Sequence, residues 1–149
     1  MSSPAGSLLL DNQLCFPLYA AARAIQQRYR PLLEPLGLTY PQYLVMLVLW
    51  EQEGIPVKSI GGRLRLDSGT LTPLLKRLES AGIVRRERQA DDNRVVLIHL
   101  TDAGRDLQAR AASVPGALLS CVAPHAEQHH ITALKAQLDG LLQMLTEDP

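Results

Sequence analysis

Two cysteines carry the most distinctive chemistry in this sequence, because a thiolate can attack a peroxide and the product can then close a disulfide. They are Cys15 and Cys121, and the 149-residue chain contains no others. Two cysteines so far apart do not form a zinc centre, which needs more soft ligands at short spacing. Cys15 lies at the start of a predicted helix, where backbone N–H groups and the helix dipole favour the thiolate. The alternative for each cysteine is a small buried hydrophobic residue.

The second candidate for chemistry is a helix with one polar face, predicted between Asp67 and Gly82. Its leucines recur with helical spacing and can pack against a core; they are Leu71, Leu74, Leu75 and Leu78. The opposite face carries side chains suited to DNA, namely Thr70, Thr72, Lys76 and Arg77. With Thr70 as the N-cap, Pro73 falls in the first turn, where proline costs little. A shorter apolar stripe upstream predicts a helix-turn-helix, and it consists of Val57, Ile60 and Leu64.

A β-hairpin is predicted after Gly82, because residues 95–100 are rich in β-branched side chains and residues 90–93 are typical of a turn. Arg94 at its tip is long enough to enter a narrow minor groove, where the negative potential is strongest. Taken singly, each basic residue here is an ordinary surface charge. A basic helix followed by an arginine-tipped hairpin is instead typical of a winged helix-turn-helix that binds double-stranded DNA.

The distribution of charge supports DNA binding even though the formal net charge is zero. Residues 58–94 contain nine Lys or Arg against five acids, a net charge of +4, and the remainder has a net charge of −4. A basic lobe attached to an acidic remainder keeps phosphate attraction local. No apolar run approaches the roughly 20 residues of a membrane span, so we expect a cytoplasmic protein that does not enter a membrane.

The flanking segments predict helices with broad apolar faces. One helix is expected over 14–33, a second follows the Thr39–Gln42 capping box, and others are expected from 102 and over 131–145. Such faces exceed what one small core requires, so 11–36 and 102–147 are predicted dimerisation helices around a DNA-binding lobe at 39–101. The fold class is therefore mainly α with a small β wing, in one domain spanning 1–149. A two-fold dimer places two recognition helices about 34 Å apart, which predicts a pseudo-palindromic operator.

At this point the residues resemble the MarR family of winged-helix repressors. The wing signature of that family is matched by Asp92-Asn93-Arg94, Leu100-Thr101 and Gly104. The blocks 11–19 and 66–78 are similar to the organic-hydroperoxide-sensing branch, the OhrR type. One departure is Ile60-Gly61-Gly62, where the family more often has helix formers; the glycines either weaken that helix or permit close approach of its neighbour.

This resemblance implies roles for individual residues. Cys15 is the expected peroxidatic residue, with Tyr29 and Tyr40 donating hydrogen bonds to its sulfur. Cys121 is the expected resolving cysteine of a two-cysteine sub-branch, joined to Cys15 of the other subunit after oxidation by an organic hydroperoxide. The expected DNA contacts, with Asp92 and Arg94 at the wing tip, are Ser68, Thr70, Thr72, Pro73, Lys76, Arg77, Arg86 and Arg94. No cofactor, metal or catalytic residue is expected, and the protein is expected not to be an enzyme.

Other interpretations remain open from the sequence. One alternative interpretation is a MarR-type repressor that responds to a small aromatic ligand, or to another oxidant such as hypochlorite. A thiol peroxidase would explain both cysteines but leaves the basic helix and wing without a purpose. Tyr29 and Tyr40 are alternatively packing residues with hydroxyls at the rim. The histidines at 125, 129 and 130 are expected to be an exposed polar cluster, since neighbouring residues of a helix point to different faces, and Trp50 is expected in the core.

Overall fold

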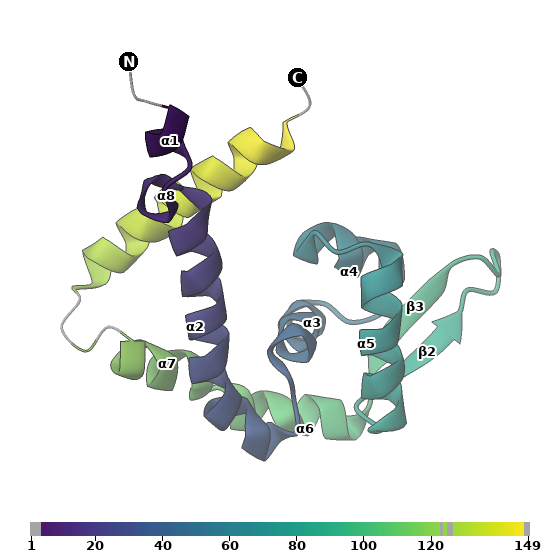
Figure 1. Cartoon of the computed structure of the whole chain (residues 1–149). Coiled ribbons are helices and arrows are strands. Elements are labelled where there is room, and N and C mark those ends of the chain that lie inside the picture. The colour runs from purple at the N-terminus through teal and green to yellow at the C-terminus, as the bar shows by residue number, and fades with distance from the viewer. Residues whose placement is uncertain (1–3, 123, 125–126, 148–149) are drawn as a thin grey trace.

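The structure is a computed structural model that describes residues 4–122, 124 and 127–147. Eight α-helices, two short 3-10 turns and three strands are found in these residues (Figure 1). Their bounds are α1 (Pro4–Ser7), η1 (Leu10–Asn12), α2 (Cys15–Leu33), η2 (Glu34–Leu36), α3 (Tyr40–Glu51), β1 (Ile55–Pro56), α4 (Val57–Leu64), α5 (Ser68–Ser80), β2 (Val84–Arg88), β3 (Val96–Leu100), α6 (Asp102–Ala111), α7 (Val114–Val122) and α8 (Gln128–Thr146). The expected class, mainly helical with a small β wing, is confirmed.

Helix α3 is the centre of the core. It begins at the predicted capping box, in which the Thr39 hydroxyl accepts from the Gln42 N–H and the Gln42 side chain accepts from the Thr39 N–H. Both sides of α3 are then apolar, and the helix is surrounded by the other elements of the lobe (Figure 1). Its buried non-aromatic apolar residues are Val45, Met46, Val48 and Leu49.

Helices α4 and α5 form the predicted helix-turn-helix. The turn between them needs a left-handed residue, and Arg65 adopts it with a φ of 53°. Gly61 accounts for one of the two glycines that depart from the family pattern, because a Cβ there would lie only 2.8 Å from the Leu66 carbonyl oxygen, whereas a Cβ on Gly62 would meet nothing within 4 Å. Gly61 lets the turn approach α4 closely, while Leu71, Leu75 and Leu78 of α5 are buried in the core.

The start of α5 differs from the prediction. Asp67 is the N-cap, and its carboxylate accepts a hydrogen bond of 2.7 Å from the Thr70 N–H. Thr70 is therefore the third residue of the helix and not its cap. Asp and Thr are both good caps, and the left-handed turn at Arg65 leads directly into Asp67, which favours the earlier start. Pro73 consequently lies inside the helix, where it removes one backbone donor.

The wing is a three-stranded antiparallel sheet in the order β1-β3-β2. Strands β2 and β3 are those expected from the sequence, with Val84 opposite Leu100 and Arg88 opposite Val96. Strand β1 was not expected, because two residues are too few to show a period. Between α5 and β2, Gly82 takes a φ of +71°, and α5 ends just before it as predicted.

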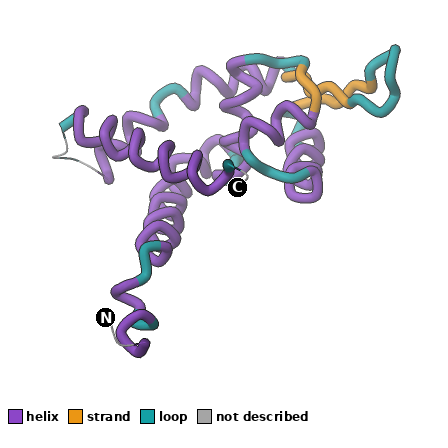
Figure 2. Tube along the Cα trace, turned by 90° about the horizontal axis from the view of Figure 1, so that it is seen from above, coloured by secondary structure: helices purple, strands orange, loops and turns teal. Residues whose placement is uncertain are grey.

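The flanking helices are much more exposed than the lobe. Figure 2 shows the strands and the N-terminal end of α2 projecting from opposite ends of the molecule. Helix α7 packs against α2, whereas α8 contains no buried residue. Several large apolar side chains on these helices face solvent in the single chain, including Phe16, Ile25, Leu119, Val122, Leu134, Leu138, Leu142 and Leu145.

Within the described residues no single helix has the length and hydropathy for a membrane span. One bent pair, Cys15–Leu36 with Tyr40–Glu51, meets those two criteria jointly, at an angle of 67°. Its second half is the central helix α3, in which six of the 12 residues are buried.

Candidate nucleic-acid interface and thiol site

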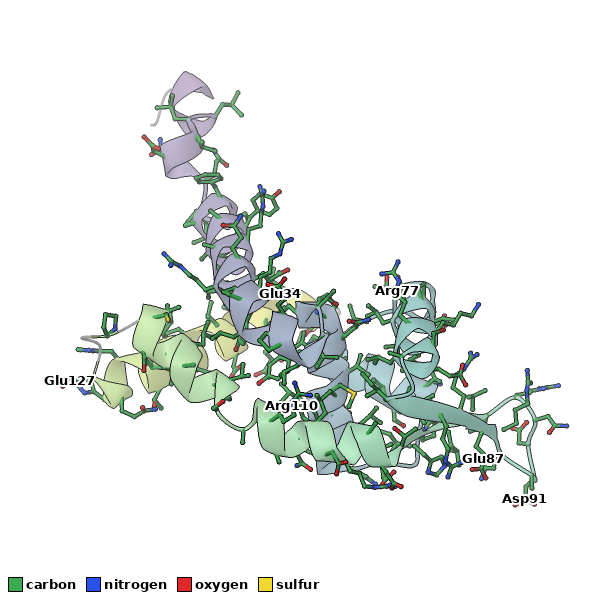
Figure 3. All side chains as sticks on the ribbon, turned by 90° about the horizontal axis from the view of Figure 1, so that it is seen from below. Glu34, Arg77, Glu87, Asp91, Arg110 and Glu127 are labelled. Atoms are coloured by element: carbon green, nitrogen blue, oxygen red, sulfur yellow. The ribbon has the colours of Figure 1, made fainter. Side chains whose placement is uncertain are left out.

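The polar face of α5 is available to a partner. Ser68, Thr70, Pro73, Lys76 and Arg77 are exposed, and Thr72 is half-buried. Figure 3 shows Arg77 projecting outward from α5, away from the body of the molecule. These are the properties required of a helix whose side chains contact base edges and phosphates in a major groove.

A groove with a volume of about 1310 Å³ lies between α4, the start of α5 and the wing. Its floor is apolar, with residues such as Val57, Leu75 and Val96. Four basic side chains from separate elements line it, namely Lys58, Arg65, Arg86 and Arg94. Arg86 and Arg94 were expected at the DNA interface, whereas Lys58 and Arg65 were only counted in the basic segment. Arg65 could have been recognised as a groove residue from the sequence, because it is a basic residue in the predicted turn between the two helices.

Hydrogen bonds and ion pairs fix several of these side chains. Arg86 on β2 donates through Nε to Glu79 on α5 at 2.8 Å, which ties the wing to the helix. Asp92 accepts from the Arg94 N–H at 3.0 Å and so shapes the wing tip. Asp67 is similarly engaged, and the backbone N–H of Thr70 holds the pKa of its carboxyl below the usual value. The carboxylates of Asp67, Glu79 and Asp92 therefore each have a structural partner.

The wing tip lies well away from the helical body. Figure 3 shows Asp91 at its outer end and Glu87 nearer the sheet. Glu87 pairs with Arg85 at 2.6 Å on the same strand. The guanidinium of Arg94 forms no ion pair with any described residue. An exposed arginine on the tip without an ion-pair partner among the described residues is suited to insertion into a minor groove.

Both cysteines are free and exposed in the single chain. Cys15 is the first residue of α2, and Cys121 is the second-last residue of α7. Figure 1 shows α7 beside the lower, C-terminal half of α2, whereas Cys15 begins the opposite end of that helix. The fold of one chain therefore leaves the two thiols apart, and both face solvent.

The two tyrosines expected at the sulfur do not reach Cys15 within the same chain. Tyr29 lies 14 residues after Cys15 on one helix, which corresponds to about 21 Å at 1.5 Å per residue. Tyr40 contacts Tyr29, with ring centroids 4.6 Å apart, and lies at the same distant end. Any contact between these tyrosines and a Cys15 thiol must therefore come from a second copy of the chain.

The tyrosine pair is suited to donate hydrogen bonds. Burial raises the pKa of Tyr29 to about 12, with smaller contributions from Tyr40 and Tyr43. Burial also raises the pKa of Tyr40. Both phenols therefore keep their protons at neutral pH and can donate to an anionic sulfur. A cavity of about 530 Å³ adjoins Tyr40 and is also lined by Gln26, Arg30 and Leu38.

Other aromatic residues have clearer structural roles. Tyr43 is buried in the core, whereas Tyr19 is 62% exposed and lies beside Arg23. Trp50 packs against the core and donates from Nε1 to the Gly104 carbonyl at 2.9 Å, which joins α3 to α6.

The histidines of α8 differ from the prediction in one respect. The rings of His129 and His130 are 4.0 Å apart instead of pointing to different faces, and Nδ1 of His129 lies 3.0 Å from a carboxylate oxygen of Glu127. His125 lies outside the described residues, within which no cluster of three metal-ligating side chains occurs.

Comparison with known proteins identifies the family. The sequence profile described as Transcriptional regulator SarA/Rot matches residues 27–110, more than half of the chain. The chain is a SarA/Rot-type member of the MarR family of winged-helix regulators. The organic hydroperoxide resistance transcriptional regulator of Bacillus subtilis (strain 168) is 48% identical over 91% of both chains. Members of the family are transcriptional regulators and not enzymes, so the thiol peroxidase alternative is not supported.

The chain is also similar to solved MarR-family structures, including one bound to DNA. Reduced AbfR bound to DNA is 42% identical, with a TM-score of 0.76 over 93% of this chain and 95% of that one. Disulfide-formed AbfR is also 42% identical, with a TM-score of 0.64 over 93% of both chains. AbfR is a protein of Staphylococcus epidermidis. The present MarR-family chain is accordingly a DNA-binding transcriptional regulator.

Proposed function

We propose that this regulator is a redox-sensing repressor that binds an inverted-repeat operator as a homodimer and releases it when an organic hydroperoxide oxidises Cys15. The observation that carries the proposal is the 48% identity, over nearly the whole chain, to a regulator named for organic hydroperoxide resistance. An exposed thiol on the first residue of α2 supports it, because a sensor cysteine must be accessible.

The exposed apolar faces of the flanking helices support homodimerisation. Leu134, Leu138 and Leu142 form a stripe on α8, and each is at least 40% exposed in the single chain. Phe16 and Ile25 on α2 are exposed as well. Soluble proteins rarely leave so many large apolar side chains in water. A two-fold interface built from the N- and C-terminal helices would cover them and would leave α5 and the wing facing DNA.

The same two-fold arrangement completes the thiol site. Because Tyr29 lies about 21 Å from Cys15 along α2, the phenols that bind the sulfur would belong to the partner subunit. Two neutral phenols with raised pKa values would donate to the Cys15 thiolate and keep it oriented toward the peroxide. Such a site exists only in the dimer, so dimerisation and sensing would depend on the same interface.

The proposed chemistry has two steps. The Cys15 thiolate attacks the outer oxygen of the hydroperoxide, the O–O bond breaks, and the alkoxide leaves and takes a proton to give an alcohol and a sulfenic acid. The Cys121 thiol of the partner subunit then attacks the sulfenic sulfur, and water leaves as the disulfide forms. Closing this bond requires the two Cα atoms to approach within about 7 Å. The movement of α2 and α7 that this requires would change the spacing of the two recognition helices.

In the reduced state, α5 would lie in the major groove and Arg94 in the flanking minor groove. The proposed contacts are Ser68, Thr70, Thr72, Pro73, Lys76, Arg77, Arg86 and Arg94, with Asp92 shaping the tip. Lys58 and Arg65 in the groove would add phosphate contacts. We expect two half-sites about 34 Å apart, one helical turn of DNA.

A gel-shift titration on the DNA upstream of the protein's own gene tests this function. Reduced protein should bind, cumene hydroperoxide should lower the affinity at least about a hundredfold, equivalent to about 2.7 kcal/mol, and dithiothreitol should restore it. Cys15→Ser should bind DNA and ignore the oxidant. Cys121→Ser should lose the covalent dimer on a non-reducing gel. Wild-type binding that is indifferent to hydroperoxide would reject the thiol switch.

The alternative inducer is a small aromatic ligand, for which the cavity beside Tyr40 offers about 530 Å³. The Cys15→Ser variant separates the two cases. If an aromatic acid releases this variant from DNA while hydroperoxide has no effect on the wild type, the ligand-responsive repressor is the correct description. Hypochlorite in place of the hydroperoxide tests which oxidant the thiol prefers.

A further inference from the structure

An aromatic row connects the tyrosine pair with the far end of α3. It consists of Tyr29 on α2 and of Tyr40, Tyr43 and Trp50 on α3. Neighbouring ring centroids are 4.6 Å apart for Tyr29 and Tyr40, 5.7 Å for Tyr29 and Tyr43, and 6.3 Å for Tyr43 and Trp50. From Tyr40 to Trp50 the helix rises about 15 Å. One rigid, buried helix therefore carries both ends of the row.

A hydrogen bond joins Trp50, at the end of the aromatic row, to α6. Its indole N–H donates to the Gly104 carbonyl at 2.9 Å, across 54 residues of sequence. Gly104 cannot be replaced without a shift, because a Cβ there would overlap the Ile83 carbonyl oxygen. The backbone of α6 thus lies directly against the residue that leads into the wing. Because these groups are closely packed, a displacement of Trp50 should be transmitted through the Gly104 backbone to Ile83.

The third link is Thr101, which joins α6 to the end of the recognition helix. Its hydroxyl, which has one proton to donate, lies 2.6 Å from the Gly82 carbonyl oxygen and 3.0 Å from the Ile83 carbonyl oxygen, and it accepts from the Gly104 N–H at 3.1 Å. Gly82 ends α5 and Ile83 precedes β2. The contacts are therefore continuous from the tyrosine pair to the junction between the recognition helix and the wing.

We propose that Trp50 is a positioning residue that couples the tyrosine pair to the recognition helix through its hydrogen bond to Gly104. Coupling between distant sites is carried by such packed and hydrogen-bonded chains. The biological signal in this scheme rests on the proposed thiol switch, which would act on Tyr29 and Tyr40 from the partner subunit. The coupling itself is a property of the reduced protein and is measurable without any oxidant.

A double-mutant cycle in the full-length reduced protein tests the coupling. Operator affinity is measured by fluorescence anisotropy for the wild type, Tyr40→Ala, Trp50→Phe and the double variant. Tyr40→Ala should lower the affinity about tenfold in the wild-type background, and about twofold or less in the Trp50→Phe background, because the link is already broken. Equal effects in both backgrounds would overturn the proposal, as would a Tyr40→Ala variant that binds like the wild type.

Two further variants keep the result interpretable. Tyr19→Ala removes an exposed tyrosine of α2 that is not in the row, so its effect should be the same in both Trp50 backgrounds. Thr101→Val breaks the third link and should suppress the Tyr40→Ala effect as Trp50→Phe does, which provides the test if Trp50→Phe does not fold. Failure of the thiol switch is a separate result, since it leaves the wild type insensitive to hydroperoxide whatever the outcome of the cycle.

Discussion

The DNA-binding lobe buries its apolar side chains within one chain, whereas the flanking helices leave many of theirs exposed. In the lobe, Leu75 and Met46 are almost completely buried within one chain. On α8, Leu138 and Leu142 face solvent at 42% and 40% exposure, although the leucine spacing is equally regular. The same kind of apolar stripe is therefore buried within the single chain in the lobe, but is exposed and available to a partner on α8.

This difference separates DNA binding from the proposed thiol switch. The groups expected to contact DNA lie on the self-contained lobe, on α5 and the wing. Both cysteines lie on the incompletely buried helices α2 and α7. Local regions with few buried contacts move most easily. A chemical change on the flanking helices can therefore alter how two lobes are held without unfolding either of them.

The largest expected effect comes from a matched pair of Leu→Ala substitutions. Leu75→Ala removes a side chain that is 1% exposed and should lower the free energy of unfolding by about 2–5 kcal/mol at any protein concentration. Leu142→Ala should have an effect that disappears as the protein is diluted, because its partner is a second chain. Thermal denaturation followed by circular dichroism over a hundredfold concentration range distinguishes them. Identical concentration dependence in the two variants would contradict the comparison.

The next effect concerns the dimer. Leu138→Glu places a charge in the middle of the α8 stripe and should produce monomers, which bind one half-site and lose at least about thirtyfold in operator affinity. The measurements are analytical ultracentrifugation and fluorescence anisotropy on one preparation. Lys135→Glu on the same helix is the control for added negative charge, since Lys135 is exposed and, among the described residues, pairs with Asp139. A Leu138→Glu protein that remains dimeric would show that α8 is not the interface.

Sequence periodicity predicted the lobe well because its signals are local. The leucine stripe of α5, the capping box at Thr39 and the turn residues before Arg94 each act within a few residues. The N-cap of α5 was misplaced because two good capping residues lie three positions apart, and the left-handed turn at Arg65 decides between them. Strand β1 is too short to show a pattern.

The thiol site was less accessible to sequence reasoning. Cysteine and tyrosine identities suggested one site, but Tyr29 and Cys15 lie at opposite ends of the same helix. The helix predicted over 14–33 contains both residues, and its rise of about 1.5 Å per residue already implies that they need a second subunit; this consequence was not drawn from the sequence. The Trp50 bond to Gly104 likewise spans 54 residues and leaves no local signal.

A smaller effect tests the wing as part of the self-contained lobe. Arg94→Ala should weaken operator binding about tenfold and reduce the slope of affinity against salt by about one ion. Folding should be unaffected, because the guanidinium has no ion-pair partner among the described residues. Arg85→Ala is the matched control, since Arg85 is already paired with Glu87 and lines no part of the groove. Equal losses in both variants would indicate a general charge effect and no specific role for the tip.

The smallest expected effect concerns the start of α5. Asp67→Ala removes the carboxylate that caps the helix and should lower Tm by about 2–4 °C at neutral pH. The folded-state pKa of Asp67 is lowered, chiefly by the Thr70 N–H. Its contribution is therefore present above the unfolded-state pKa of 3.8 and is lost as the pH falls through the folded value. The difference in Tm between wild type and variant should accordingly shrink below pH 4, and a constant difference down to pH 2 would show that charge on Asp67 does not stabilise the helix.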